Sequence, residues 1–325
     1  MTETDIISPT VLLTGPTSGI GAAMLQALVA HPSRPRLVLL ARDATGLERA
    51  MGIVRERGLE VHGLMIDLGD LATVRDSLTE LADRQHAGEI APIDVAILNA
   101  GAQFTDRRKV GVQGYELTFT VNVISQHLLL RGLEPSLASN AHVVLMGSST
   151  HRGKRASFNL VPDPRWSDPI GLATPDSLVG RASRPAADRF AGGTAYATSK
   201  LALVTLAHDW AARLSAAGRR LNTYDPGLVA GTGLGKDMVA YRYWVWKRLM
   251  PAMSVLPGAT TPRVAARHAV ELAMGDAHPT LHDGYVEIGK PSSAEAVTFD
   301  ATRRAALWSW LETAVADMVP RHVSL

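Results

Sequence analysis

The feature that most constrains the fold lies at residues 10–30, where a short apolar run leads through a glycine-rich turn into a helix. The run at 10–13 has the length of a buried strand, and residues 22–30 read as a helix. Glycines in such a turn let the backbone approach a pyrophosphate, whose charge then lies among the unpaired N–H groups of the helix N-terminus. The alternative is a glycine-rich surface turn. The candidate phosphate-binding residues are Gly15, Thr17, Ser18, Gly19, Ile20 and Gly21.

Apolar runs and helical segments alternate along the chain after this turn. We expect strands at residues 36–41, 61–66, 93–98, 142–146 and 221–224, and helices at 47–57, 71–86, 113–133 and from Tyr196 to about 217. This alternation predicts an α/β fold with a Rossmann-type doubly wound parallel sheet and helices on both faces. With 325 residues, 46% of them hydrophobic, the chain is expected to form one domain over residues 1–325.

Ligands of such sheets bind at the carboxyl ends of the strands, where this chain places polar and small residues. Arg42 follows the second strand, and an arginine there pairs with a 2′-phosphate, which favours NADP(H) over NAD(H). Asp43, one place later, is the type of residue that favours NAD(H), and an arginine that only caps the sheet edge is a further alternative. Asp67 and Leu68 follow the third strand, where adenine would lie. The fourth strand ends at residues that let a backbone pass close to a ligand, namely Asn99, Ala100 and Gly101.

Three sets of side chains are candidates for proton transfer. Tyr196 and Lys200 are four residues apart on a helix and therefore share one face. The lysine charge is expected to lower the tyrosine pKa and to make it a general acid, whereas the structural alternative is a half-buried ring beside a solvated amine. Asn122 lies in an apolar helix, as a core amide or a relay. The fifth strand ends in hydroxyls that either touch a substrate oxygen or cap a turn, namely Ser148, Ser149 and Thr150.

Two segments are expected to cover the site. Residues 151–192 are proline-rich and loop-like, and we interpret them as an insertion over the active site. Residues 238–251 hold aromatic and basic side chains, within a lid expected at about 231–260. This aromatic segment has three interpretations: a lid over a bulky apolar or aromatic substrate, ordinary core packing, or a basic helix on a membrane surface. A final helix is expected at about 299–319.

Composition and charge exclude several classes of function. The formal net charge is only +2, which gives no basic surface for a nucleic-acid partner. The chain contains no cysteine, which excludes disulfides and thiolate metal sites. The N-terminus lacks the basic region and apolar stretch of a signal peptide, so we expect a cytoplasmic protein. The histidines show no ligand spacing, and no metal is predicted.

In their order along residues 10 to about 289, these motifs resemble those of short-chain dehydrogenase/reductases. The long insertion and C-terminal tail are most similar to the branch of retinol-dehydrogenase-like and protochlorophyllide-reductase-like proteins. The resemblance implies a cofactor turn at Gly15, Gly19 and Gly21, adenine contacts at Asp67 and Leu68, and a supporting role for Asn99. It implies a nicotinamide turn at Pro226, Gly227, Val229 and Thr232. It also implies a catalytic set of Asn122, Ser149, Tyr196 and Lys200, with Thr150 as the alternative hydroxyl.

The activity implied by this resemblance is an NADP(H)-dependent interconversion of a carbonyl and an alcohol on a bulky apolar or aromatic small molecule, by a monomer or homodimer. Tyr196 would exchange a proton with the substrate oxygen, which Ser149 would fix. Lys200 would hold the ribose, and Asn122 would hold a water that links Lys200 to solvent. One alternative is a reductase of a conjugated C=C bond, although Leu228 stands where protochlorophyllide reductases carry a cysteine. Another is a catalytically silent NADP(H)-binding regulator.

Overall fold

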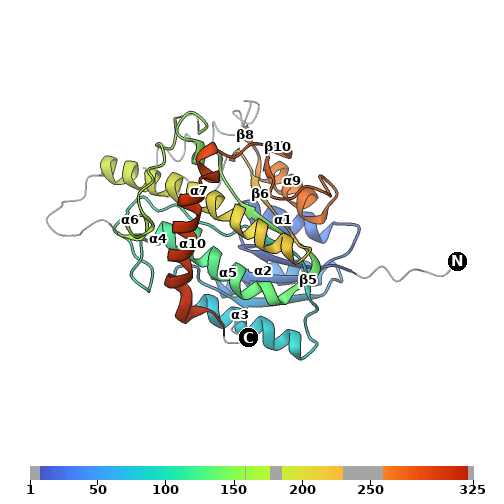
Figure 1. Cartoon of the computed structure of the whole chain (residues 1–325). Helices are drawn as coiled ribbons and strands as arrows, with labels where there is room; N and C mark the ends of the chain where they lie inside the picture. The colour runs from blue at the N-terminus through green and yellow to red at the C-terminus, as the bar shows by residue number, and fades with distance from the viewer. Residues whose placement is uncertain (1–7, 158, 176–184, 230–258, 321–325) are drawn as a thin grey trace.

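A single eight-stranded sheet forms the centre of the protein. The computed structural model describes residues 8–157, 159–175, 185–229 and 259–320 (Figure 1). The strands are β1 (Thr10–Thr14), β2 (Arg36–Ala41), β3 (Val61–Met65), β4 (Ile93–Leu98), β5 (Leu137–Met146), β6 (Arg220–Asp225), β9 (Tyr285–Glu287) and β10 (Lys290–Ser292). Their order is β10-β9-β6-β5-β4-β1-β2-β3, and all neighbours pair in parallel except β9 and β10. The short strands β7 (Leu228–Val229) and β8 (Ala259–Thr260) form a separate parallel pair.

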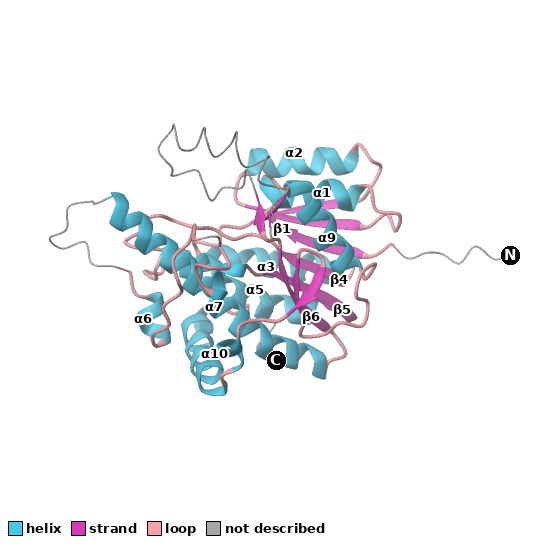
Figure 2. Ribbon diagram, turned by 90° about the horizontal axis from the view of Figure 1, so that it is seen from above, coloured by secondary structure: helices cyan, strands magenta, loops and turns pink. Residues whose placement is uncertain are grey.

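Helices cover both faces of the sheet (Figure 2). One face carries α1 (Gly19–Val29), α2 (Ala44–Arg55) and α9 (Pro262–Met274), and the other carries α3 (Leu71–His86), α5 (Ser125–Leu133), α7 (Pro185–Ala216) and α10 (Ala301–Val315). Side-chain alternation along each strand divides the core accordingly, because Val11 and Leu13 pack toward α1 whereas Leu12 packs toward α3. The predicted doubly wound Rossmann-type fold is therefore confirmed.

Local signals in the sequence account for several helix ends. Asp43 caps α2 by accepting from the Gly46 N–H at 2.9 Å, and Asp70 caps α3 by accepting from the Ala72 N–H at 3.0 Å. Helix α9 has Pro262 in its first turn and ends at Gly275, whose φ of 81° is left-handed. The caps explain why these boundaries lie within a few residues of those expected from the sequence.

The helix expected at residues 113–133 differs from the prediction. The chain is helical only from α4 (Leu117–Phe119), passes through the π-helical segment η1 (Thr120–Ile124), and continues as α5. Glu116 accepts from the Phe119 N–H at 2.6 Å and thereby starts the helix, while Gly114, with φ of 85°, belongs to the preceding turn. A π-turn inside a helix is often found at functional sites. Here it contains Asn122.

The segment expected as an insertion and the C-terminal segment both pack near α7. Within residues 151–192 lie part of η3 (Ser149–Arg152), α6 (Pro169–Ala173) and the beginning of α7. Helix α10 lies across α7 (Figure 1) and buries Leu307, Leu311 and Val315 completely. The remaining short helices are η2 (Glu134–Ser136), η5 (Ala296–Phe299) and η6 (Ala316–Met318). Within the described ranges, no helix has the length and apolar character needed to cross a membrane.

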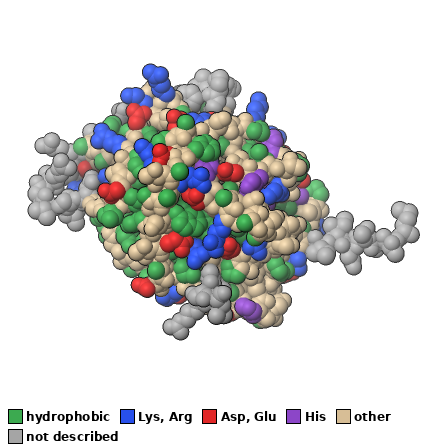
Figure 3. Space-filling model, in the orientation of Figure 1, with side chains coloured by type: hydrophobic (Ala, Val, Ile, Leu, Met, Phe, Trp, Pro, Cys, Tyr) green, Lys and Arg blue, Asp and Glu red, His purple; other side chains and the backbone are tan. Residues whose placement is uncertain are grey.

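Charged residues of both signs are mixed over the face shown in Figure 3. The predicted lid at 231–260 falls almost wholly outside the described residues, and the aromatic segment 238–251 lies entirely outside them. The three interpretations of that segment therefore remain predictions.

Candidate active site

The glycine turn after β1 has a backbone that only glycine fits at two places. Gly15 and Gly19 have φ of 69° and 57°, in the left-handed region. A Cβ atom at Gly21 would collide with the carbonyl oxygen of Gly15. The amide of Asn99 at the end of β4 donates to the carbonyl oxygens of Thr14 at 2.9 Å and Gly15 at 3.3 Å. The turn is thus held against the end of the neighbouring strand.

The N-terminus of α1 is open to an anion. Ser18 precedes the helix with extended backbone, and its side chain makes no capping hydrogen bond. The first turn of α1 contains no acidic residue, and Thr17, Ser18 and Gly19 are exposed. The N–H groups that a side chain would otherwise satisfy are available to an incoming oxygen ligand. The role of this turn in binding phosphate stays a prediction, and its backbone is compatible with it.

Arg42 and Asp67 meet at the ends of β2 and β3. The Arg42 side chain is 74% exposed, and its Nη1 lies 4.0 Å from Oδ1 of Asp67. Asp43 is engaged in capping α2, so the arginine is the charged residue that reaches toward the strand ends. The side chain of Leu68 is buried in the core, which leaves its main chain to make the predicted adenine contact.

Tyr196 and Lys200 lie on α7 with Ser148 opposite them. Lys200 is buried, and its Nζ donates to the carbonyl oxygen of Met146 at 2.7 Å and lies 5.8 Å from the centre of the Tyr196 ring. Ser148 acts on the Tyr196 hydroxyl and lowers its pKa. The helix therefore brings the phenol and the ammonium to the end of β5, as the four-residue spacing predicts.

The sequence predicted Ser149 as the partner of the phenol, whereas the structure brings Ser148 to it. Ser148 still has extended backbone, with φ of −170° and ψ of 141°, whereas Ser149 begins the helical turn η3. Ser148, which lies just before this change of direction, is the hydroxyl that acts on Tyr196. Thr150, the predicted alternative, donates to Oγ of Ser148 at 3.0 Å and so supports that serine.

The pKa of Tyr196 also shifts in the direction opposite to the prediction. Part of the ring remains accessible, but burial of the hydroxyl raises its pKa to about 12, partly opposed by the hydrogen bond with Ser148. Burial lowers the pKa of Lys200 to about 8. Desolvation is the largest effect on both groups, because each lies within the protein, and the negative charge of Asp225 acts to raise both pKa values.

Asn122 joins three parts of the site. Its Oδ1 accepts from the Ala102 N–H at 2.9 Å, and its Nδ2 donates to the Ala102 carbonyl at 2.7 Å and to Oγ of Ser199 at 3.0 Å. A Cβ atom at Gly101 would lie 3.0 Å from this amide oxygen and 3.7 Å from Nζ of Lys200. The side chain is fully engaged as a clamp between the end of β4 and α7. A water held by Asn122 stays a prediction.

The turn after β6 contains the predicted nicotinamide contacts Pro226, Gly227 and Val229. The Gly227 N–H donates to Oδ1 of Asp225 at 2.8 Å, and Thr260 Oγ1 donates to the carbonyl of Pro226 at 2.7 Å. These bonds fix the turn at the carboxyl edge, beside Ser148. Thr232 lies outside the described residues.

Comparisons with known proteins agree with this geometry. The family described as short chain dehydrogenase matches residues 9–160. A protein of Streptomyces sp. (strain C5), named as a daunorubicin C-13 ketoreductase, is 30% identical over 95% of this chain and 93% of its own length. This chain belongs to the short-chain dehydrogenase/reductase family. It is an oxidoreductase of that family.

A further relative and a solved structure of similar fold extend the comparison for this short-chain dehydrogenase/reductase. A chloroplastic protochlorophyllide reductase of Marchantia paleacea is 28% identical over 71% of this chain, but the match spans only 50% of that protein. A 3-oxoacyl-(acyl-carrier-protein) reductase of Agrobacterium tumefaciens, crystallised with NADP, has a similar fold with a TM-score of 0.60 and 22% identity, covering 86% of this chain and 92% of that one.

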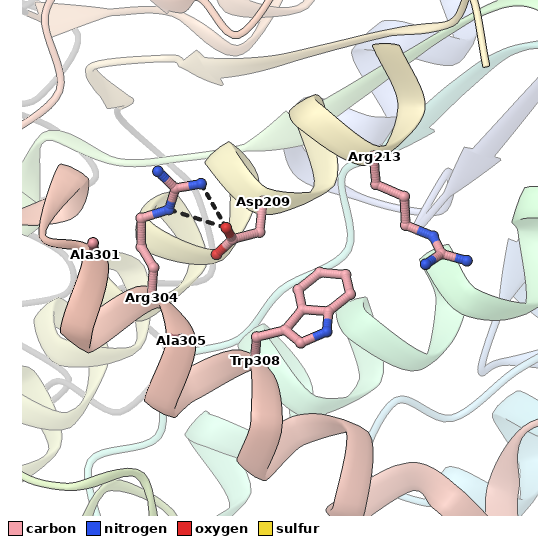
Figure 4. Close-up of a pocket in the computed structure, with 6 residues that line it drawn as sticks. All are labelled: Asp209, Arg213, Ala301, Arg304, Ala305 and Trp308. Atoms are coloured by element: carbon pink, nitrogen blue, oxygen red, sulfur yellow. Dashed lines mark hydrogen bonds and ion pairs between the residues drawn. The ribbon is translucent and has the colours of Figure 1, made fainter. Parts of the chain in front are cut away.

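One cavity of this short-chain dehydrogenase/reductase lies away from the glycine turn and from Tyr196. It has a volume of about 530 Å³ and lies between α7 and α10, lined by Asp209, Arg213, Ala301, Arg304, Ala305 and Trp308 (Figure 4). Asp209 is nine residues beyond Lys200, about 14 Å along the helix axis. Arg304 pairs with Asp209 through Nη2 at 2.5 Å, so the cavity wall is already neutralised. We place the chemistry at the strand ends instead.

Sequence reasoning named Ser148 among the hydroxyls after the fifth strand but missed three residues at the same edge of the sheet. Asp225, His151 and Tyr285 gave no periodic signal, because they come from three separate elements. In the described part of the chain, no cluster of three histidine or acidic residues could hold a metal ion.

Proposed function

We propose that this enzyme is an NADP(H)-dependent oxidoreductase that interconverts a carbonyl and an alcohol on a bulky apolar or aromatic small molecule. The observation that carries the proposal is the meeting of Tyr196, Lys200 and Ser148 at the end of β5, where Lys200 donates to the Met146 carbonyl and lies 5.8 Å from the centre of the Tyr196 ring. This arrangement offers two hydroxyls to a single substrate oxygen at the carboxyl edge of the sheet. The name of the Streptomyces relative, a ketoreductase, supports the carbonyl group as the reacting group.

The residues of the cofactor site fit NADP(H). The uncapped N-terminus of α1 suits a pyrophosphate, and the absence of a side chain at Gly21 lets the turn pack closely against the helix. Arg42 is placed to pair with a 2′-phosphate, since Asp43 is engaged in its cap. The fold neighbour from Agrobacterium, crystallised with NADP, supports the same choice.

Bound NADPH would supply the hydride that reduces the carbonyl carbon. Tyr196 would donate its phenolic proton to the carbonyl oxygen, which becomes the alcohol hydroxyl. Ser148 would hold that oxygen by hydrogen bonding as negative charge develops on it. Lys200 would stabilise the resulting phenolate and return a proton toward it. The raised pKa of Tyr196 suits an acid that stays protonated until the substrate oxygen becomes basic.

Reduction of a conjugated C=C bond is the second candidate. The observation that favours it is the similarity to protochlorophyllide reductases. Leu228 occupies the place where that branch carries a cysteine, and the chain has none. A Tyr196 donor would serve either reaction, because both need a proton at one end of the reduced bond. A silent NADP(H)-binding regulator would have no use for this hydroxyl pair.

The test compares NADPH and NADH oxidation with a panel of carbonyls. The panel would include daunorubicin as a polycyclic ketone, a small aliphatic ketone, an aromatic aldehyde and a conjugated enone. Reduction of daunorubicin or another large ketone with preference for NADPH is expected. Product analysis separates the alcohol from a saturated ketone. Tight NADPH binding without turnover of any member would support the regulator instead.

The variant Tyr196→Phe tests the acid role. It should retain NADPH binding and lose at least about 100-fold in kcat, since general acid catalysis is commonly worth that much. Tyr115→Phe is the matched control, because Tyr115 packs edge-on against Trp310 away from the site. Retention of more than about a tenth of the turnover by Tyr196→Phe would contradict the proposal.

A further inference from the structure

A buried carboxylate at the end of β6 is unused by the catalytic set described above. Asp225 is fully buried, and burial raises its pKa to about 6. Its Oδ2 accepts from the Tyr285 hydroxyl at 2.7 Å, and its Oδ1 accepts from the Gly227 N–H at 2.8 Å. A neutral amide could satisfy much of this bonding without burying a charge, which is unfavourable in a protein interior. A buried carboxylate charge therefore needs a group of opposite charge nearby.

A chain of contacts leads from Asp225 to the serine that meets the phenol. The Tyr285 ring packs against His151 with centroids 5.0 Å apart, and its hydroxyl lies 3.4 Å from His151 Nδ1. His151 Nε2 accepts from the Glu295 N–H at 3.1 Å, so the neutral ring carries its proton on Nδ1. That Nδ1–H donates to the carbonyl oxygen of Ser148 at 2.7 Å. Burial lowers the pKa of His151 to about 4, which keeps the ring neutral.

Strand register brings the same carboxylate to the edge of the sheet at which the Lys200 ammonium lies. Lys200 donates to the carbonyl of Met146, and Met146 is registered opposite Tyr224, the residue before Asp225. Burial lowers the pKa of Lys200, and the negative charge of Asp225 opposes that shift. The titratable and charged groups that surround the carboxylate are Tyr285 and Glu287 on β9, His151 and Arg152 on η3, Tyr196 and Lys200 on α7, and Tyr224 on β6.

We propose that Asp225 is a positioning residue whose carboxylate is the buried counter-charge of the Lys200 ammonium. Through Tyr285 and His151, it also holds the backbone of Ser148 against the end of β6. Through Gly227, it fixes the turn on which the proposed nicotinamide site is built. Asp225 acts on the reaction only through these neighbours. The kinetic part of its test rests on the proposed function, and the titration part does not.

The first measurement follows the ionisation of Lys200 without cofactor or substrate. The chain has six lysines, so protein labelled with ¹³C-lysine gives few ε-carbon signals, and Lys200→Met identifies the one of interest. Asp225→Asn keeps the size and the hydrogen-bonding atoms but removes the charge. The Lys200 titration should move to lower pH by about one unit in this variant, because an opposite charge favours the ammonium.

The matched control is Asp94→Asn. Asp94 lies near the amino end of β4, at the opposite edge of the sheet, and its Oδ2 accepts from the Thr10 N–H at 2.8 Å. This variant should leave the Lys200 titration unchanged. Tyr285→Phe keeps the charge and removes one hydrogen bond, so its shift should be small. An unchanged Lys200 titration in folded Asp225→Asn, or an equal shift in Asp94→Asn, would overturn the proposal.

The second measurement is the pH profile of kcat/KM for carbonyl reduction by NADPH. The charge of Asp225 also raises the pKa of Tyr196, although by less than burial does. In Asp225→Asn, the fall of kcat/KM at alkaline pH should therefore move to lower pH by about half a unit or more. Tyr285→Phe should lower kcat/KM several-fold without that displacement. An unmoved alkaline limb in Asp225→Asn would contradict the counter-charge. If the unaltered enzyme reduces no carbonyl, the proposed function is wrong. The titration of Lys200 then still tests whether Asp225 is its counter-charge.

Discussion

Replacement of Ser148 by alanine tests which hydroxyl faces the reacting oxygen. In the structure, Ser148 acts on the pKa of Tyr196, and its hydroxyl accepts from Thr150 Oγ1 at 3.0 Å. Loss of one hydrogen-bond donor to a developing oxyanion lowers kcat by about 100- to 1000-fold, or about 3 to 4 kcal/mol. The orphaned Thr150 hydroxyl should lower the free energy of unfolding by about 1 kcal/mol, too little to unfold the domain.

Ser149→Ala is the matched control, since it removes the same atoms one residue later, where η3 has begun. Its kcat should remain within about threefold of the parent enzyme, because it removes no donor from the reacting oxygen. The assay is the initial rate of NADPH oxidation with the best carbonyl of the panel, beside a thermal melt of each variant. If Ser149→Ala loses more activity than Ser148→Ala, the assignment of the hydroxyl is wrong.

The Ser148→Ala variant should also change the pH dependence of the reaction rate. The hydrogen bond with Ser148 lowers the pKa of Tyr196 against the larger effect of burial. Its loss should raise that pKa further, because the phenolate loses a donor. Alcohol oxidation by NADP needs the phenolate, so its rise in rate with pH should move to higher pH in Ser148→Ala. A profile that stays in place would show that the two hydroxyls are not coupled.

Three further outcomes are expected. Arg42→Ala should raise the KM for NADPH by about tenfold or more, which corresponds to the loss of a charge-assisted hydrogen bond, and should leave the KM for NADH unchanged. Equal effects on the two KM values would contradict the 2′-phosphate role. Gly21→Ala should abolish NADPH binding, followed by fluorescence, because its Cβ meets the Gly15 carbonyl, whereas Gly52→Ala has open space around it and should bind normally. The pKa values of His142 and His151 fall to about 4, mainly through burial, so the unfolded chain binds more protons below pH 6.5 and stability should fall from there to pH 4. Each histidine lowers the free energy of unfolding by up to about 3 kcal/mol as the pH falls, and the raised pKa of Asp225 adds back about 3 kcal/mol. The two histidines together outweigh the aspartate. A melting temperature that stays level from pH 6.5 to 4.5 would refute this balance.

The order of elements and the cofactor edge followed from local sequence. Runs such as residues 36–41 are buried on both faces, so their composition alone indicates strands, and the alternation with helices implies the parallel topology. Gly15 and Gly21 were readable because backbone conformation and close approach restrict those positions to glycine. Tyr196 and Lys200 were readable because helical spacing fixes which residues share a face.

Only the tertiary structure decided how the polar groups of the site pair with one another. A change of backbone direction at one residue exchanged Ser149 for Ser148, and no local pattern records such a turn. Burial reversed the expected shift of the Tyr196 pKa, because desolvation depends on everything packed around the hydroxyl. Asp225, Tyr285 and His151 come from three elements far apart in the sequence, and they meet only because β6, β9 and η3 end at one edge of the sheet. Local sequence thus determined which elements form, and their packing determined the ionisation and the contacts of Tyr196 and Lys200.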